Sequence, residues 1–169
     1  LALCSPLNPT GTMFTKEQLS EICEIVLEEN KKRGAGEKPL YIMYDQIYAM
    51  LTFGEEHFNP VSLFPELRDY TIFVDGTSKC FAATGVRVGW GFGPTEVIDK
   101  MKALLTHVGA WAPKPEQEAV AKFYCNISGK TDKDFRFPVF ATAFGQNGIG
   151  SNFPERFPKL IANANERKG

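Results

Sequence analysis

Lys79 and Arg87 are the two basic residues whose surroundings could support chemistry. Lys79 ends the run Asp-Gly-Thr-Ser-Lys at 75–79, and Arg87 lies inside Gly-Val-Arg-Val-Gly-Trp at 85–90. An uncharged lysine amine can form a Schiff base with an aldehyde, and an aldehyde that carries a phosphate also needs a cation close by. Lys79 and Arg87 could supply these two groups. Taken alone, each is also typical of a solvated turn, so the prediction depends on other parts of the chain.

Two further clusters lie upstream of the lysine. The first is Asn-Pro-Thr-Gly at 8–11, and the second is Asp-Gln-Ile-Tyr at 45–48. In this order, followed by Ser-Lys and then the arginine, the pieces resemble the class I and II aminotransferases. Members of that family are pyridoxal phosphate enzymes of fold type I.

The resemblance implies six cofactor-binding residues, of which the lysine is also catalytic. Lys79 would hold pyridoxal phosphate as a Schiff base and would then move the proton from the α-carbon of the amino acid substrate. Asp45 would keep the ring nitrogen protonated, so that the ring can accept negative charge. The implied set is Asn8, Asp45, Tyr48, Ser78, Lys79 and Arg87.

The remaining members of the set would bind the ring oxygen and the phosphate. By the resemblance, Tyr48 and Asn8 donate hydrogen bonds to the phenolic oxygen of the ring. Ser78 and Arg87 would bind the phosphate, because a planar guanidinium can contact two oxygens at once. Many relatives carry a second hydroxyl where this chain has Gly76. The phosphate contact is therefore expected to be weaker or to use backbone amides.

Each motif also has a purely structural interpretation. Asp45 could cap a turn, Tyr48 could be a partly buried aromatic residue with a solvated hydroxyl, and 8–11 could be a turn between a strand and a helix. Cys80, beside the lysine, is interpreted as a packing residue.

The strands that would position these residues are predicted from continuous apolar runs. Such runs occur at 40–44, 71–74 and 86–92, and they are typical of buried parallel strands. Because helical segments separate them, the pattern predicts an α/β domain with a mostly parallel sheet and flanking helices.

Three helices are predicted between and after these strands. Thr15 and Gln18 form a capping box that starts the first, the second covers 96–107, and Pro115 opens the third. The expected apolar faces are Leu19, Ile22, Cys23 and Val26; Ile98, Met101, Leu104, Leu105 and Val108; and Ala119, Val120 and Phe123.

We expect the chain to comprise two parts. Residues 1–125 would form the carboxyl-terminal half of the large cofactor-binding domain of fold type I. Residues 126–169 lose the helical and strand periods and are expected to form an irregular tail. Since the first residues are an apolar run without an initiator Met, the start of the chain is expected to be cut.

Composition limits the classes of partner. The formal net charge is -1 at pH 7, which gives no electrostatic footprint for nucleic acid or an anionic membrane. No apolar stretch approaches the ~20 residues that span a bilayer. Four cysteines without a paired spacing favour reduced thiols in the cytoplasm, and two isolated histidines disfavour a metal site.

The function predicted from the resemblance is transfer of an amino group between an L-amino acid and a 2-oxo acid. A homodimer is the implied partner arrangement. A lyase or decarboxylase on the same fold remains open, because lysine and cofactor serve those reactions as well. Two further hypotheses also stay open: a non-catalytic fragment of such an enzyme, and an interaction module without cofactor affinity.

Overall fold

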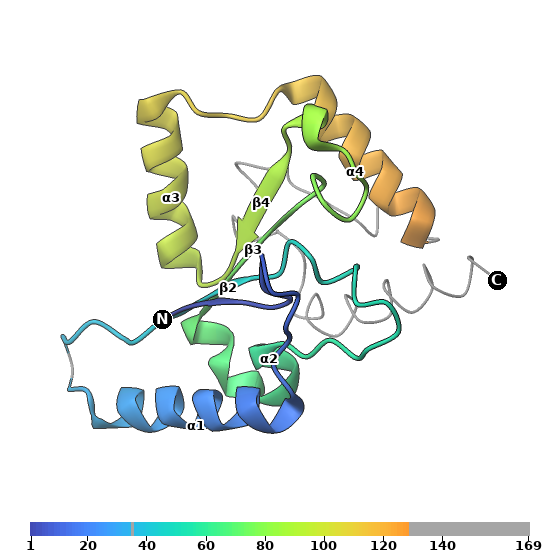
Figure 1. The fold of residues 1–169 in the computed structure, drawn as a ribbon. Coiled ribbons are helices and arrows are strands. Elements are labelled where there is room, and N and C mark those ends of the chain that lie inside the picture. Colours follow the sequence, from blue (N-terminus) through green and yellow to red (C-terminus); the bar gives the residue numbers. More distant parts are fainter. Residues whose placement is uncertain (35, 129–169) are drawn as a thin grey trace. The chain divides into compact units, whose positions relative to one another are not determined.

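The computed structural model of the chain describes residues 1–34 and 36–128 (Figure 1). These residues divide into two compact units. The first comprises Leu1–Asp75 together with Gly91–Pro94, and the second comprises Gly76–Trp90 and the described residues from Thr95 onward.

A parallel sheet is the framework of the first unit. Strands β1 (Ala2–Cys4), β2 (Ile42–Asp45) and β3 (Thr71–Gly76) pair in parallel, and β4 (Gly89–Phe92) follows in the sheet order β1-β2-β3-β4. The stacked rings of Phe73 and Phe92, with centroids 4.6 Å apart, join β3 to β4. The predicted α/β class with a mostly parallel sheet is confirmed.

Two strands begin later than the predicted runs. The run at 40–44 becomes a strand only at Ile42, because the Asn30 side chain binds both backbone polar groups of Leu40 at 2.7 and 3.0 Å. The run at 86–92 becomes a strand only at Gly89, because Thr84–Val86 forms a 3₁₀ turn.

Helices on the connections make the parallel pairing possible. Helix α1 (Lys16–Lys32) links β1 to β2, while α2 (Pro60–Leu63) and a 3₁₀ helix (Pro65–Tyr70) link β2 to β3. The capping box predicted for α1 is present, since Gln18 N–H donates to the Thr15 hydroxyl at 3.2 Å and Thr15 N–H donates to the Gln18 side chain at 3.1 Å.

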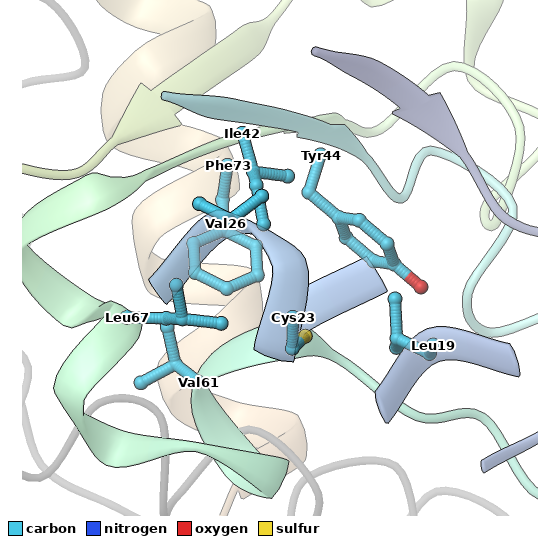
Figure 2. Packing of buried hydrophobic residues seen from close by; sticks show 8 residues of the cluster. All are labelled: Leu19, Cys23, Val26, Ile42, Tyr44, Val61, Leu67 and Phe73. Atoms are coloured by element: carbon cyan, nitrogen blue, oxygen red, sulfur yellow. The ribbon is translucent and has the colours of Figure 1, made fainter. Parts of the chain in front are cut away.

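The core of the first unit lies between α1, α2 and the strands β2 and β3. Figure 2 shows its side chains pointing toward one another. Tyr44 is fully buried, and its hydroxyl donates to the Phe58 carbonyl oxygen at 2.7 Å, so its one polar group is satisfied. The cluster consists of Leu19, Cys23, Val26, Ile42, Tyr44, Val61, Leu67 and Phe73.

Strand β2 is buried on one face rather than on both. Ile42 and Tyr44 are fully buried on the core side, whereas Met43 between them is 45% exposed. The apolar run therefore predicted the strand but not the exposure of its second face.

Gly93 marks a close approach of two backbone segments in the first unit. A Cβ atom at this position would lie 2.6 Å from the Thr71 carbonyl oxygen and 3.1 Å from Ile72 Cα. The chain can therefore leave β4 beside β3 only because residue 93 has no side chain.

In the second unit, helices α3 (Thr95–Val108) and α4 (Lys114–Ser128) follow the 3₁₀ turn and the first two residues of β4, Gly89 and Trp90. The predicted second helix is present, but of its expected apolar face Ile98 is buried while Met101, Leu104 and Val108 are 37, 64 and 67% exposed.

The buried face of α4 differs from the predicted one. Val120 is buried as expected, but it lies beside Gln117 and Tyr124, while Ala119 is exposed. The rings explain this orientation, because Tyr124 packs edge-on against Trp90 with centroids 5.4 Å apart. The α4 backbone continues to Ser128, and residues 129–169 of the predicted irregular tail lie outside the described residues.

Candidate cofactor site

The first unit carries Asn8, Asp45 and Tyr48 after the carboxyl ends of β1 and β2. Cys4, the last residue of β1, pairs with Asp45, the last residue of β2. Ligands of open α/β sheets bind at this edge. The segment after β1 is a closed turn, in which Gly11 N–H donates to the Leu7 carbonyl oxygen at 2.7 Å and Leu7 N–H donates to Thr12 at 2.9 Å.

A cavity of about 380 Å³ lies beside this turn. Asn8 and Tyr48, forty residues apart in sequence, both line it. Apolar side chains form much of the remaining wall, among them Met13 and Leu51. The structure therefore brings an amide and a phenol to one cavity, and these are the two groups that the resemblance assigns to one ring oxygen.

Asp45 is half-buried and is not among the residues that line this cavity. Its Oδ1 accepts a hydrogen bond from Ile47 N–H at 3.0 Å, which is the turn-capping geometry of an aspartate. Its charge also acts on Cys4, since burial and then the Asp45 carboxylate raise the pKa of that thiol.

Gln46 and Asp75 form a buried polar contact that the sequence analysis missed. Gln46 is 2% exposed and Asp75 is 7% exposed, and Gln46 Nε2 donates to Asp75 Oδ2 at 3.3 Å. Gln46 N–H also donates to the Val74 carbonyl oxygen at 3.0 Å. The signal was a polar residue at the end of each of two neighbouring parallel strands, next to the predicted site residues.

The second unit carries Ser78, Lys79 and Arg87. Lys79 is exposed in a turn directly after β3, and its carbonyl oxygen accepts from Ala82 N–H at 3.1 Å. Thr77 closes the base of the loop, because its buried hydroxyl and its N–H both bind the Val88 carbonyl oxygen at 3.1 Å. The Thr77 hydroxyl therefore donates its hydrogen to a partner within the loop.

Arg87 has a left-handed backbone conformation, with φ of 56°. Its Nη1 donates to the Thr84 carbonyl oxygen at 2.7 Å, and the side chain is exposed. A guanidinium carries five N–H donors in a fixed fork, so further donors of Arg87 can bind an anion.

The described residues contain neither a metal-binding cluster nor a membrane-spanning helix. Within 1–34 and 36–128, no group of three or more His, Cys, Asp or Glu side chains has the arrangement of a metal site. In the same residues, no helix has both the length and the apolar composition needed to cross a bilayer.

Comparison with known proteins gives the family. The model of the aminotransferase class I and II family matches residues 1–134. The chain is 41% identical over 108 residues to an aspartate aminotransferase from Streptomyces avermitilis, covering 63% of this chain and 24% of that protein. It is 35% identical over 122 residues to a kynurenine–oxoglutarate transaminase from Dictyostelium discoideum, covering 72% and 26%.

A solved structure agrees with these relatives. The N-succinyldiaminopimelate aminotransferase from Mycobacterium tuberculosis superposes with a TM-score of 0.61 at 29% identity, covering 70% of this chain and 29% of that one. The chain belongs to the class I and II aminotransferase family. It spans about a quarter of the length of the curated relatives that it matches.

The predicted residues have the chemistry that pyridoxal phosphate requires. The Asn8 amide and the Tyr48 phenol are hydrogen-bond donors on one cavity. Asp45 is a carboxylate, Lys79 is an amine, and Ser78 and Arg87 offer a hydroxyl and a guanidinium for a phosphate. The donor set therefore fits the cofactor.

Proposed function

We propose that the intact protein is a pyridoxal phosphate-dependent aminotransferase that moves an amino group between an L-amino acid and a 2-oxo acid. The observation that carries this proposal is the placement of Asn8 and Tyr48 on one cavity within a chain of the aminotransferase family. The cofactor supplies an electron sink for the negative charge that develops at the substrate α-carbon.

The first unit would hold the ring of the cofactor. Asn8 and Tyr48 would donate hydrogen bonds to its phenolic oxygen, and Asp45 would hold a proton on its ring nitrogen. Asp45 Oδ1 is oriented by Ile47 N–H, which limits the rotation of the carboxylate. Gln46 and Asp75 support this arrangement, because they join the ends of β2 and β3 beside Asp45.

The second unit would hold the phosphate and perform the proton transfer. Ser78 and Arg87 would bind phosphate oxygens, and Lys79 would bind the cofactor covalently. Once the amino acid has displaced it, the Lys79 amine would take the proton from the α-carbon and return it to the cofactor. The exposed position of Lys79 after β3 supports a role that requires access to ligands.

Covalent attachment tests the lysine assignment. The intact protein is incubated with pyridoxal phosphate, reduced with borohydride and digested, and the modified peptide is identified by mass spectrometry. We expect the cofactor on Lys79 and a visible absorption band that disappears in Lys79→Ala. The matched control is Lys114→Ala, because that side chain is 76% exposed and lies on α4. A band of equal strength in Lys79→Ala would refute the assignment.

A half-reaction tests the type of chemistry. An aminotransferase given an amino acid alone should release one equivalent of the 2-oxo acid and then stop until a second oxo acid is added. Continuous release of carbon dioxide or of ammonia under the same conditions would contradict the proposal and would indicate a decarboxylase or a lyase.

We also propose that the partner of the intact protein is a second copy, as the family resemblance implies, and that it works in the cytoplasm. Cys4, Cys23 and Cys80 form no disulfide among the residues that the structure describes, which supports a reducing compartment. Light scattering of the intact protein should give the mass of a dimer, and a monomer at micromolar concentration would contradict this part of the proposal.

A further inference from the structure

Ser5 connects β1 to the turn that carries Asn8. Ser5 is 2% exposed, and its N–H donates to the Asp45 carbonyl oxygen at 3.1 Å. Its hydroxyl oxygen accepts from Phe14 N–H at 3.2 Å, which closes the base of the segment between β1 and α1. The segment that contains the turn is therefore held at both ends by one buried residue.

His57 reaches the same residue from fifty-two positions away. His57 Nε2 lies 3.0 Å from the Ser5 carbonyl oxygen. Since a carbonyl oxygen can only accept, Nε2 must carry the hydrogen. Burial lowers the pKa of His57, in agreement with a neutral ring, and the ring packs against Tyr44 with centroids 6.1 Å apart.

The direction of the Asn8 side chain depends on this backbone. Among the residues that the structure describes, no hydrogen bond holds the side-chain amide of Asn8, whereas its backbone is hydrogen-bonded to the Cys4 thiol. The turn is closed by backbone hydrogen bonds of Leu7 and Gly11, and it begins two residues after Ser5. A displacement of the Ser5 carbonyl would therefore move the Asn8 amide along the wall of the cavity.

We propose that His57 is a positioning residue for the cofactor site. By donating to the Ser5 carbonyl oxygen, it fixes the turn at 8–11 so that the Asn8 amide meets the ring oxygen of pyridoxal phosphate. This inference rests on the proposed function, because it requires contact between Asn8 and the cofactor.

The test compares His57→Gln with His57→Asn in the intact protein loaded with pyridoxal phosphate. A glutamine amide reaches about as far as Nε2, whereas an asparagine amide is one carbon shorter. We expect the dissociation constant of the cofactor to rise about tenfold in His57→Asn, the size of one lost hydrogen bond, and to stay near the wild-type value in His57→Gln.

A spectroscopic readout separates positioning from general stability. Donation to the ring oxygen favours its ionised form, so losing the Asn8 contact should move the pH titration of the Lys79-dependent absorption band to higher pH. His57→Asn should show this shift, Asn8→Ala should show it as well, and the double variant should show no more than Asn8→Ala alone.

Asn30→Leu is the matched control. It removes two side-chain hydrogen bonds to Leu40, at the start of β2 and away from the turn. It should lower stability without changing the pH at which the absorption band titrates. If His57→Asn shifts the titration no more than Asn30→Leu does, while the band still requires Lys79, the inference is wrong and the proposed function stands. A band that persists in Lys79→Ala would instead overturn the proposed function.

The glutamine variant decides the question if His57→Asn does not fold. It should titrate as the wild type does, because it keeps the donor. A shift in His57→Gln as large as that of Asn8→Ala would show that the Nε2 donor does not position the turn.

Discussion

The Gln46 side-chain amide binds the Asp75 carboxylate at 3.3 Å, across the carboxyl ends of two neighbouring parallel strands. Both residues are buried, and each lies next to a segment that carries predicted cofactor ligands. Gln46 follows Asp45 directly, and Asp75 lies four residues before Lys79. One hydrogen bond therefore joins the ends of the two strands from which these segments begin.

Replacing Gln46 by leucine should lower the free energy of unfolding. A hydrogen bond to a charged group contributes about 1.5–3 kcal/mol, and the leucine variant loses it without a large change in volume. Urea unfolding followed by circular dichroism measures the effect. Gln46→Glu is the informative partner variant, because two carboxylates would then face each other. Its stability should improve as the pH is lowered from 8 to 5, relative to the wild type.

The burial of two apolar residues of α1 predicts that their replacement by alanine lowers stability to different extents. Leu19 is fully buried in the core, whereas Ile25 is 61% exposed. Leu19→Ala should cost about 2–5 kcal/mol of unfolding free energy, and Ile25→Ala should change it by less than about 0.5 kcal/mol. Denaturant midpoints of the two variants give the comparison. Equal losses would show that α1 does not pack through the Leu19 face.

The capping box at the start of α1 should also be measurable. Thr15→Ala removes the acceptor for Gln18 N–H, and this loss should cost about 1 kcal/mol. Lys16→Ala, on an exposed side chain of the same turn, is the control and should be nearly neutral. A thermal melt of each variant would reveal the difference. A neutral Thr15→Ala would mean that the helix begins later than Lys16.

Acidification should weaken the fold through His57. Because burial lowers its pKa below the ordinary value of 6.5, the unfolded chain takes up a proton first as the pH falls. The contribution of the neutral ring is complete above pH 6.5 and is lost as the pH falls from there through the folded pKa. His57→Gln should lack this part of the pH dependence. The unfolding free energy of the wild type and of His57→Gln is measured at successive pH values. Identical slopes of the two curves would contradict the prediction.

The sequence predicted those features that depend on neighbours along the chain. Helix α1 could be predicted from two local patterns, which are the capping box of Thr15 and Gln18 and the periodic apolar face of Leu19, Cys23 and Val26. Continuous apolar runs were sufficient for β3, and for β2 apart from its ends. These are local patterns, and tertiary packing did not alter them.

Features that depend on distant partners could not be predicted in this way. The contact of His57 with Ser5 spans fifty-two residues, and that of Gln46 with Asp75 spans twenty-nine. No periodicity encodes such pairs. The buried face of α4 was predicted wrongly for the same reason, because Trp90, which precedes the helix by more than twenty residues, determines where Tyr124 turns.

Gly93 has a genetic consequence. Because the Thr71 carbonyl oxygen already occupies the place of a Cβ atom, the obstacle is backbone and cannot rotate away. In a saturation library of the gene that is selected for folded protein, the recovered clones should keep glycine at codon 93. The base changes found in that codon should therefore be confined to its third base, since every third base encodes glycine there.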